Sequence, residues 1–364
     1  MINRPEPGPG ILKIKPYCGG KGGHMAGNVY KLSSNESALG PSKKAQKAYS
    51  DAVASISIYP DGGYVPLRQA ISERHQLRPE QIVCGAGSDE ILSHLAQSFL
   101  QPGDEAIYSA HGFTIYPLIT LAQGAVPIAV TEHNLTTDVD GILAAVTPRT
   151  RIVFIANPNN PTGTYINYEE MRRLHGRLRS NILLVIDAAY AEYVLANDYD
   201  AGIELVTSSE NVVMTRTFSK VYALAALRLG WAYCPEHIAD VINRVRLPFN
   251  LTTPTIEAGI AAISDQRHVE ASIAHNETWR DRIFEELSAM GLHLTPSVAN
   301  FLLIEFPEDA GRTAHDADAF MTARGIFLRD VSDYGLSRHL RMTIAGEKAN
   351  LAALASMLDF MSST

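Results

Sequence analysis

The chain has 364 residues, of which 46% are hydrophobic and 19% charged, and its formal net charge is -8. This length and composition are typical of a globular protein with two domains. The negative charge provides no basic field, so we expect neither nucleic acid nor a membrane as a partner. Scattered cysteines, histidines without metal-ligand spacing and an N-terminal stretch without an apolar run predict a cytoplasmic protein with no metal site.

Residues 1–40 are rich in glycine and proline, which predicts an arm rather than a packed layer. Between residues 41 and 250, short apolar runs alternate with helical patterns, as in a largely parallel sheet that helices cover on both faces. The last run follows its predecessor too closely for a crossover helix and is a candidate antiparallel strand. The strands expected here are 81–84, 106–109, 126–130, 151–155, 182–186, 212–215 and 231–234.

A second region, residues 251–364, has a different pattern. It begins with a long helical stretch from 255 to 290 and ends with a helix from 348 to 360. Three strands are expected between these helices, at 300–305, 326–329 and 340–344. The fold class is therefore α/β, with a large domain at 41–250 and a smaller α+β domain at 251–364.

The carboxyl ends of strands in open α/β sheets are where ligands bind, and unusual residues follow several of the predicted strands. After the first strand comes Gly-Ala-Gly-Ser-Asp-Glu, in which Gly87 or Ser88 precedes a helix that begins near Asp89. Free N–H groups and the positive end of the helix dipole at such a turn suit a phosphate group. A capped helix without a ligand is the alternative interpretation.

The next two strand ends carry an aromatic residue and an asparagine-rich loop. Phe113 follows the second strand, where it is either a ligand contact or a core aromatic. Asn160 lies in Asn-Pro-Asn-Asn-Pro-Thr-Gly, and the following proline restricts it to non-helical backbone. That conformation suits an amide that points at a ligand oxygen, although turns of this composition are also common without such a function.

Asp187 ends a five-residue apolar run, and Tyr190 follows it. An uncompensated buried carboxylate is costly, so Asp187 needs a partner. A cationic ring nitrogen of a ligand, a nearby arginine and the N-terminus of the next helix are the candidates.

Lys220 lies in Val-Met-Thr-Arg-Thr-Phe-Ser-Lys, directly after a predicted strand. A lysine that forms imines must lose its proton, so its pKa has to fall below the usual value of about 10.4. Arg228, eight residues on, could lower this pKa, or it could hold a phosphate together with Thr217 and Ser219. Taken alone, a lysine after a strand is most often a solvated surface residue.

The pattern T-x-S-K-x-x-x-L-A-x-L-R-x-G at 217–230 resembles the cofactor-lysine signature of the fold type I pyridoxal-phosphate aminotransferases. In detail it is similar to that of the histidinol-phosphate aminotransferases. The resemblance implies that Lys220 binds the cofactor covalently, that Asp187 contacts the pyridine nitrogen and that Tyr190 contacts the ring oxygen, all three being catalytic. It implies pyridoxal 5'-phosphate contacts for Gly87, Ser88, Asp89, Phe113, Asn160, Thr217, Ser219 and Arg228.

The resemblance extends to residues that contact the substrate. Arg341 matches an arginine that binds a substrate carboxylate, and Arg329 matches a second arginine typical of the histidinol-phosphate enzymes. Tyr17 matches a tyrosine that closes over the substrate, and Asn300 an asparagine near it. The substrates implied are histidinol phosphate and the glutamate/2-oxoglutarate couple, in L-histidine biosynthesis. An aromatic amino-acid aminotransferase, a threonine-phosphate decarboxylase and a non-catalytic regulator that binds the cofactor are the alternatives.

Tyr59, in Tyr-Pro-Asp-Gly, resembles a tyrosine that contacts the cofactor phosphate of the neighbouring subunit. This match implies a homodimer. Ser57 and Ile58 precede the tyrosine where a basic residue is frequent in the family, which puts the local charge in doubt but not the role of the tyrosine.

Overall fold

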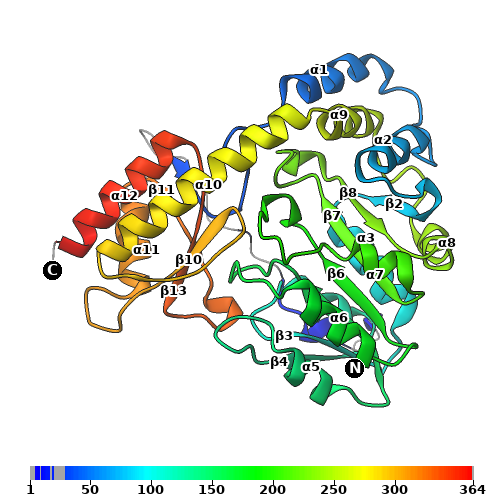
Figure 1. Cartoon of the computed structure of the whole chain (residues 1–364), viewed down its shortest axis with the longest axis horizontal. Helices are drawn as coiled ribbons and strands as arrows, with labels where there is room; N and C mark the ends of the chain where they lie inside the picture. Colours follow the sequence, from blue (N-terminus) through cyan, green and yellow to red (C-terminus); the bar gives the residue numbers. More distant parts are fainter. Residues whose placement is uncertain (1–4, 9, 17–18, 20–28, 363–364) are drawn as a thin grey trace.

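The computed structural model describes residues 5–8, 10–16, 19 and 29–362. Its main sheet consists of β2 (Ile82–Gly85), β3 (Glu105–Ser109), β4 (Val126–Val130), β5 (Thr150–Ala156), β6 (Leu183–Asp187), β7 (Val212–Thr217) and β8 (Gly230–Tyr233). The strand order is β2-β8-β7-β6-β5-β3-β4 (Figure 1). Strands β3 to β7 pair in parallel, whereas β8 is antiparallel to both β7 and β2. The expected parallel sheet with an antiparallel last strand is confirmed.

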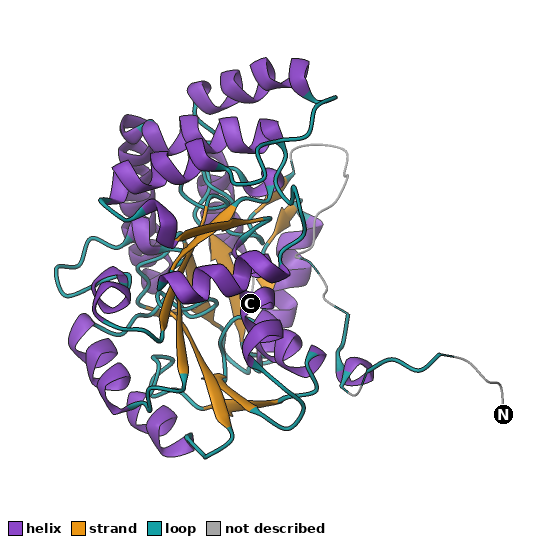
Figure 2. Cartoon of the chain, turned by 90° about the vertical axis from the view of Figure 1, so that its right-hand side faces the viewer, coloured by secondary structure: helices purple, strands orange, loops and turns teal. Residues whose placement is uncertain are grey.

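Both faces of the main sheet are buried, because its strands are apolar on both sides. In β6, Leu184 and Ile186 belong to one core cluster, and Leu183 and Val185 to the other. This alternation follows from the two-residue period of a strand, and it explains why the strands read as continuous apolar runs. Helices cover each face (Figure 2). One core includes residues of α2 (Val65–His75), α5 (Val139–Ala145), α6 (Tyr168–Arg177), α7 (Ile203–Ser208) and α9 (Thr253–Ser264), and the other includes residues of α3 (Ser88–Phe99), α4 (Ile115–Ala122) and α8 (Glu236–Val245).

A second sheet has the order β12-β13-β10-β9 and a core cluster of its own. Its strands are β9 (His293–Thr295), β10 (Phe301–Glu305), β12 (Arg329–Asp330) and β13 (His339–Thr343). The helices α10 (Gln266–Ala289), α11 (Ala314–Ala323) and α12 (Glu347–Ser362) contribute buried residues to this core. In Figure 1 this part lies to one side of the main sheet, in yellow, orange and red.

Two elements of this second region differ from the prediction. The single helix expected at 255–290 is two helices, α9 and α10, because Asp265 between them has φ -93° and ψ 64°, outside the helical region. The strand expected at 326–329 is also divided. Residues 326–327 form β11 (Ile326–Phe327), which pairs in parallel with β1 (Tyr30–Lys31), whereas β12 pairs with β13. Apolar periodicity continues across both breaks, so the sequence pattern does not reveal them.

The segment that follows the glycine-rich stretch is packed, contrary to its interpretation as an arm. Leu32 is 1% exposed and belongs to the core of the second sheet, and Ser33 and Asn35 are also buried. After Ser42 caps α1 (Lys43–Ala52), the chain continues to α2 and the main sheet. The domain limits at residues 40 and 250 remain predictions. Within the described residues, none of the helices has the length and hydropathy to span a bilayer.

Candidate active site

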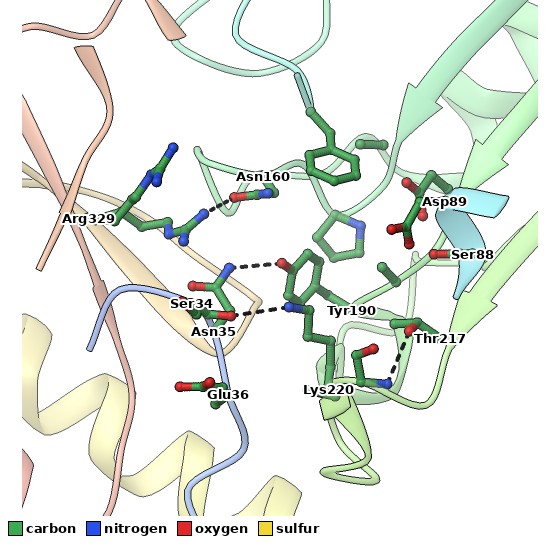
Figure 3. Close-up of a pocket in the computed structure, with 18 of the residues that line it drawn as sticks. Ser34, Asn35, Glu36, Ser88, Asp89, Asn160, Tyr190, Thr217, Lys220 and Arg329 are labelled. Carbon is green, nitrogen blue, oxygen red and sulfur yellow. Dashed lines mark hydrogen bonds between the residues drawn. The ribbon is translucent and has the colours of Figure 1, made fainter. Parts of the chain in front are cut away.

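A pocket of about 260 Å³ lies at the carboxyl ends of β5, β6 and β7 (Figure 3). The opposite side of this pocket consists of residues 33–36 and of arginines from β12 and β13. Most of the residues singled out in the sequence line it, namely Ser88, Asp89, Phe113, Asn160, Asp187, Tyr190, Thr217, Ser219, Lys220, Arg228, Arg329 and Arg341. Residues from distant parts of the chain thus meet at one place.

One end of the pocket is suited to an anion. Gly87 is the N-cap of α3 with φ 92°, and a Cβ atom there would overlap the Arg228 guanidinium. A Cβ atom on Gly230 would overlap the backbone of Ser88, so both positions require glycine. Arg228 Nη2 lies 2.9 Å from Asp89 Oδ2, and Nη1 lies 3.4 Å from Ser219 Oγ. A helix N-terminus, hydroxyl groups and a guanidinium converge here, as in phosphate sites.

Asp187 closes β6 as a buried carboxylate. Tyr116 Oη donates to its Oδ2 at 2.9 Å, and Thr215 Oγ1 donates to its Oδ1 at 3.3 Å. Burial raises the pKa of Asp187 to about 6, although both donors act in the opposite direction. Among the described side chains, no lysine, arginine or histidine forms an ion pair with it. A buried carboxylate that lines a pocket in this way is suited to a cationic group of a ligand.

Lys220 is half-buried, close to Tyr190. Burial, followed by the positive charge of Arg341, lowers the pKa of Lys220 to about 8. Its Nζ lies 3.4 Å from the Ser34 carbonyl oxygen and 5.6 Å from the centre of the Tyr190 ring. A fraction of this amine is therefore neutral near pH 7 to 8, the form that attacks carbonyl groups and accepts protons.

The other end of the pocket carries two arginines, which are 5% and 8% exposed. Arg341 Nη1 donates to Asn160 Oδ1, and its Nη2 donates to the Ser33 carbonyl oxygen at 2.8 Å. Arg329 Nη2 donates to Asp333 Oδ2 at 3.0 Å. Two buried guanidinium groups on a pocket can bind a second anion, and Asn160 holds one of them in place.

Tyr17 is outside the described residues, and two other predicted residues, Asn300 and Tyr59, lie elsewhere. Asn300 does not line the pocket but donates from Nδ2 to the Asn35 carbonyl oxygen at 3.1 Å. Tyr59 is 80% exposed, stacks on Phe249 with ring centres 4.7 Å apart, and lies in a separate surface cavity.

Sequence reasoning missed several residues at the pocket. Residues 33–36 and Tyr334 of η6 (Ser332–Tyr334) line the pocket. Tyr116 does not line it but donates a hydrogen bond to Asp187. The polar run Ser-Ser-Asn-Glu after an apolar leucine was a possible signal for the first group. The adjacent glycines and prolines obscured it. No group of three or more metal-binding side chains occurs in the part of the chain that the structure describes.

Comparison with known proteins agrees with this geometry. The family model for class I and II aminotransferases matches residues 27–358. The chain is 53% identical over 362 residues to a histidinol-phosphate aminotransferase of Rhodopseudomonas palustris strain TIE-1, and 52% identical to that of strain HaA2, with 99% of the chain and of the strain TIE-1 protein covered. A crystal structure of histidinol-phosphate aminotransferase from Sinorhizobium meliloti in complex with pyridoxal-5'-phosphate superposes with a TM-score of 0.88, at 26% identity over 97% of each chain. The chain belongs to the class I and II aminotransferases and, within them, to the histidinol-phosphate aminotransferase family.

Proposed function

We propose that the protein transfers the amino group of histidinol phosphate to 2-oxoglutarate, with pyridoxal 5'-phosphate as cofactor, in L-histidine biosynthesis. The observation that carries this proposal is that one pocket combines a lysine and an aspartate on the ends of neighbouring strands with two buried arginines opposite them. The 53% identical relative supports the same substrate. The alternatives are transamination of phenylalanine or tyrosine and decarboxylation of threonine phosphate.

The residues present fit the cofactor. A Cβ atom on Gly87 or Gly230 would overlap neighbouring groups at this end of the pocket. With glycine at both positions, the N-terminus of α3, Ser219 and Arg228 lie together and can hold the cofactor phosphate. Asp187 lacks a cationic partner among the described side chains, which suits a protonated ring nitrogen. When bound, pyridoxal phosphate supplies an aldehyde that reacts with amines and a ring that withdraws electrons.

The side chains of the pocket then have distinct tasks. Asp187 would keep the proton on the ring nitrogen, because its carboxylate is buried and lines the pocket. Lys220, whose pKa is lowered to about 8, would be the base that takes the proton from the carbon that bears the substrate amine and the acid that delivers it to the C4' carbon of the cofactor. Tyr190 and Phe113 also line the pocket, where Tyr190 would donate a hydrogen bond to the ring oxygen and Phe113 would pack against one face of the ring.

Arg329 and Arg341 bind the anionic end of each substrate. In histidinol phosphate, a phosphorylated hydroxymethyl group takes the place of the α-carboxylate of an amino acid. Because guanidinium groups pair in a bidentate manner with both anions, the same two arginines can serve histidinol phosphate and glutamate in turn. Asn160 and the Ser33 carbonyl oxygen fix the orientation of Arg341 before substrate arrives.

An assay of the purified protein tests this substrate assignment. Histidinol phosphate, phenylalanine and threonine phosphate are each supplied with 2-oxoglutarate, and both glutamate and carbon dioxide are measured. We expect histidinol phosphate to give the highest kcat/KM, with glutamate and no carbon dioxide. A higher kcat/KM for phenylalanine, or carbon dioxide from threonine phosphate, would contradict the assignment.

We also propose a homodimer in which Tyr59 reaches the cofactor phosphate of the partner subunit. Its ring is exposed and does not line the pocket of its own chain. It lies among exposed apolar side chains, of which Ile56, Ile58 and Phe249 are 69%, 71% and 46% exposed. An apolar patch of this kind is typical of a protein interface.

The two described cysteines, Cys84 and Cys234, are free thiols, which supports the proposed cytoplasmic location.

Subunit exchange tests the shared site. Tyr59→Ala and Lys220→Ala are mixed at limiting cofactor and allowed to form hybrid dimers. With sharing across the dimer, one hybrid site carries both lesions and the other is intact, so activity rises above the mean of the two parents. If Tyr59 contacts the site of its own chain, every hybrid site carries one lesion and no rise occurs.

A further inference from the structure

Asn35 is a buried pocket residue with a hydrogen-bond network that the roles assigned above do not explain. It is 1% exposed and has a left-handed backbone, with φ 55°. Its Nδ2 donates to Tyr190 Oη at 2.8 Å, and Figure 3 shows the two groups facing each other across the pocket. Thr343 contacts Asn35 at two atoms, the backbone nitrogen at 2.9 Å and the side-chain Oδ1 at 3.2 Å.

The orientation of the Asn35 amide gives each bond in this network a direction. The Asn35 backbone N–H donates to Thr343 Oγ1, and the Thr343 hydroxyl donates to Asn35 Oδ1. The side-chain oxygen of Asn35 therefore faces Thr343, and its nitrogen faces Tyr190. An amide nitrogen only donates, so Tyr190 Oη accepts this bond and its own hydrogen is directed to an acceptor elsewhere.

We propose that Asn35 is a positioning residue that orients the Tyr190 hydroxyl hydrogen into the pocket, toward the ring oxygen of pyridoxal phosphate. The inference rests on the role proposed above for Tyr190. A hydroxyl hydrogen can rotate between two acceptors, and a fixed donor on one side removes that freedom. The hydrogen bond to the ring oxygen is then formed without reorganisation, which is how a preorganised donor contributes to catalysis.

The geometry also predicts which kinetic constant depends on Asn35. Arg341 contacts this segment through the Ser33 carbonyl oxygen, a backbone atom that a substitution at Asn35 does not remove. Binding of the substrate anion should therefore persist when the Asn35 side chain is lost. The effect should fall on kcat, where the Tyr190 hydroxyl acts, rather than on KM.

The test is a double-mutant cycle of Asn35→Gly and Tyr190→Phe in the protein loaded with pyridoxal phosphate. Glycine adopts left-handed backbone readily, so Asn35→Gly removes the side chain without strain at φ 55°. The main readout is the pH midpoint of the visible absorbance change of the bound cofactor. A hydrogen bond donated to an oxygen stabilises its anionic form, so its loss raises this midpoint.

We expect Tyr190→Phe and Asn35→Gly each to raise the midpoint, and the double variant to match Tyr190→Phe alone. Asn35→Gly should also lower kcat about three- to ten-fold, which corresponds to one neutral hydrogen bond, and should leave KM for histidinol phosphate nearly unchanged. If Asn35→Gly raises the midpoint by the same amount in both backgrounds, Asn35 acts independently of Tyr190 and the inference is wrong. If Tyr190→Phe shifts the midpoint and Asn35→Gly does not, the inference about Asn35 is wrong, whereas the proposed role of Tyr190 is not affected. If Tyr190→Phe shifts nothing, the proposed role of Tyr190 fails as well.

Thr343 provides a second variant. Thr343→Val removes the hydroxyl that fixes the Asn35 amide, so it should raise the midpoint in the same direction, and Thr343→Ser should restore it. Asn350→Ala is the matched control, because Asn350 is a buried asparagine outside the pocket that bonds to the Ala345 backbone. This control should lower the thermal midpoint of unfolding and leave the absorbance midpoint unchanged. An equal absorbance shift in Asn350→Ala would show that general destabilisation, not Tyr190, explains the effect.

Discussion

The two halves of the pocket are constructed in different ways. The half proposed to hold the cofactor comes from the N-terminus of α3 and the ends of β6 and β7, which belong to one sheet or pack directly on it. The half proposed to hold the substrate anion comes from residues 33–36 and from β12 and β13 of the second sheet. A single sheet fixes the first half, whereas the second depends on how separate segments pack. Substitutions in the two halves should therefore have separable effects.

The largest effect is expected in the cofactor half, for Lys220→Ala. Removal of the group that moves the proton should lower kcat by about 10² to 10⁴-fold. The visible absorbance band of the purified protein should change as well. Lys47→Ala is the control, because Lys47 is exposed and pairs with Asp51 in α1. Wild-type kcat in Lys220→Ala would show that another residue moves the proton.

Asp187→Asn should have a smaller effect whose magnitude depends on pH. The folded-state pKa of about 6 lies above the ordinary value of 3.8, so the folded protein holds a proton that the unfolded chain releases between these values. The free energy of unfolding therefore falls as pH rises through this window, and the full cost of the buried carboxylate is present above pH 6. In cofactor-free protein, Asp187→Asn should be more stable than wild type by about 2 to 3 kcal/mol near pH 7.5, and the difference should vanish toward pH 4.

Denaturant unfolding at several pH values measures this difference. Asp51→Asn is the control, because Asp51 is 63% exposed in its side chain and pairs with Lys47 on the surface. A stability difference for Asp187→Asn that does not change between pH 4 and pH 7.5 would contradict the raised pKa.

The smallest effect is expected for Asp89→Asn, in the same half. Asp89 and Arg228 are 45% and 46% exposed in their side chains, and an exposed ion pair contributes little to stability. Loss of this carboxylate also removes a negative charge beside the proposed phosphate site. We expect the dissociation constant of the cofactor, measured by absorbance titration, to change by no more than about five-fold. A much larger increase would mean that Asp89 itself contacts the cofactor.

The cofactor half could be predicted from sequence because each of its residues follows an apolar run, and the carboxyl ends of parallel strands meet at one edge of the sheet. The order of the strands in the sheet could not be predicted, since hydrophobic periodicity does not show which strands are neighbours. Asn35 is the clearest omission. Its partners Tyr190 and Thr343 lie 155 and 308 residues away, and its left-handed backbone has no sequence signal. For Arg329 and Arg341, only the family resemblance indicates a role in substrate binding. The sequence does not predict which residues these two arginines contact.

The separation of the two halves can be measured directly with Arg228→Ala and Arg341→Ala. For each variant, absorbance titration gives the dissociation constant of the cofactor, and assays at saturating cofactor give kcat/KM for histidinol phosphate. Arg228→Ala should raise the dissociation constant by about ten- to a hundred-fold and leave kcat/KM nearly unchanged, since it removes a charge-assisted hydrogen bond to phosphate. Arg341→Ala should leave cofactor binding unchanged and cost about 2 to 5 kcal/mol in kcat/KM. Equal losses of cofactor affinity and kcat/KM in both variants would contradict the division of the pocket into a cofactor half and a substrate half.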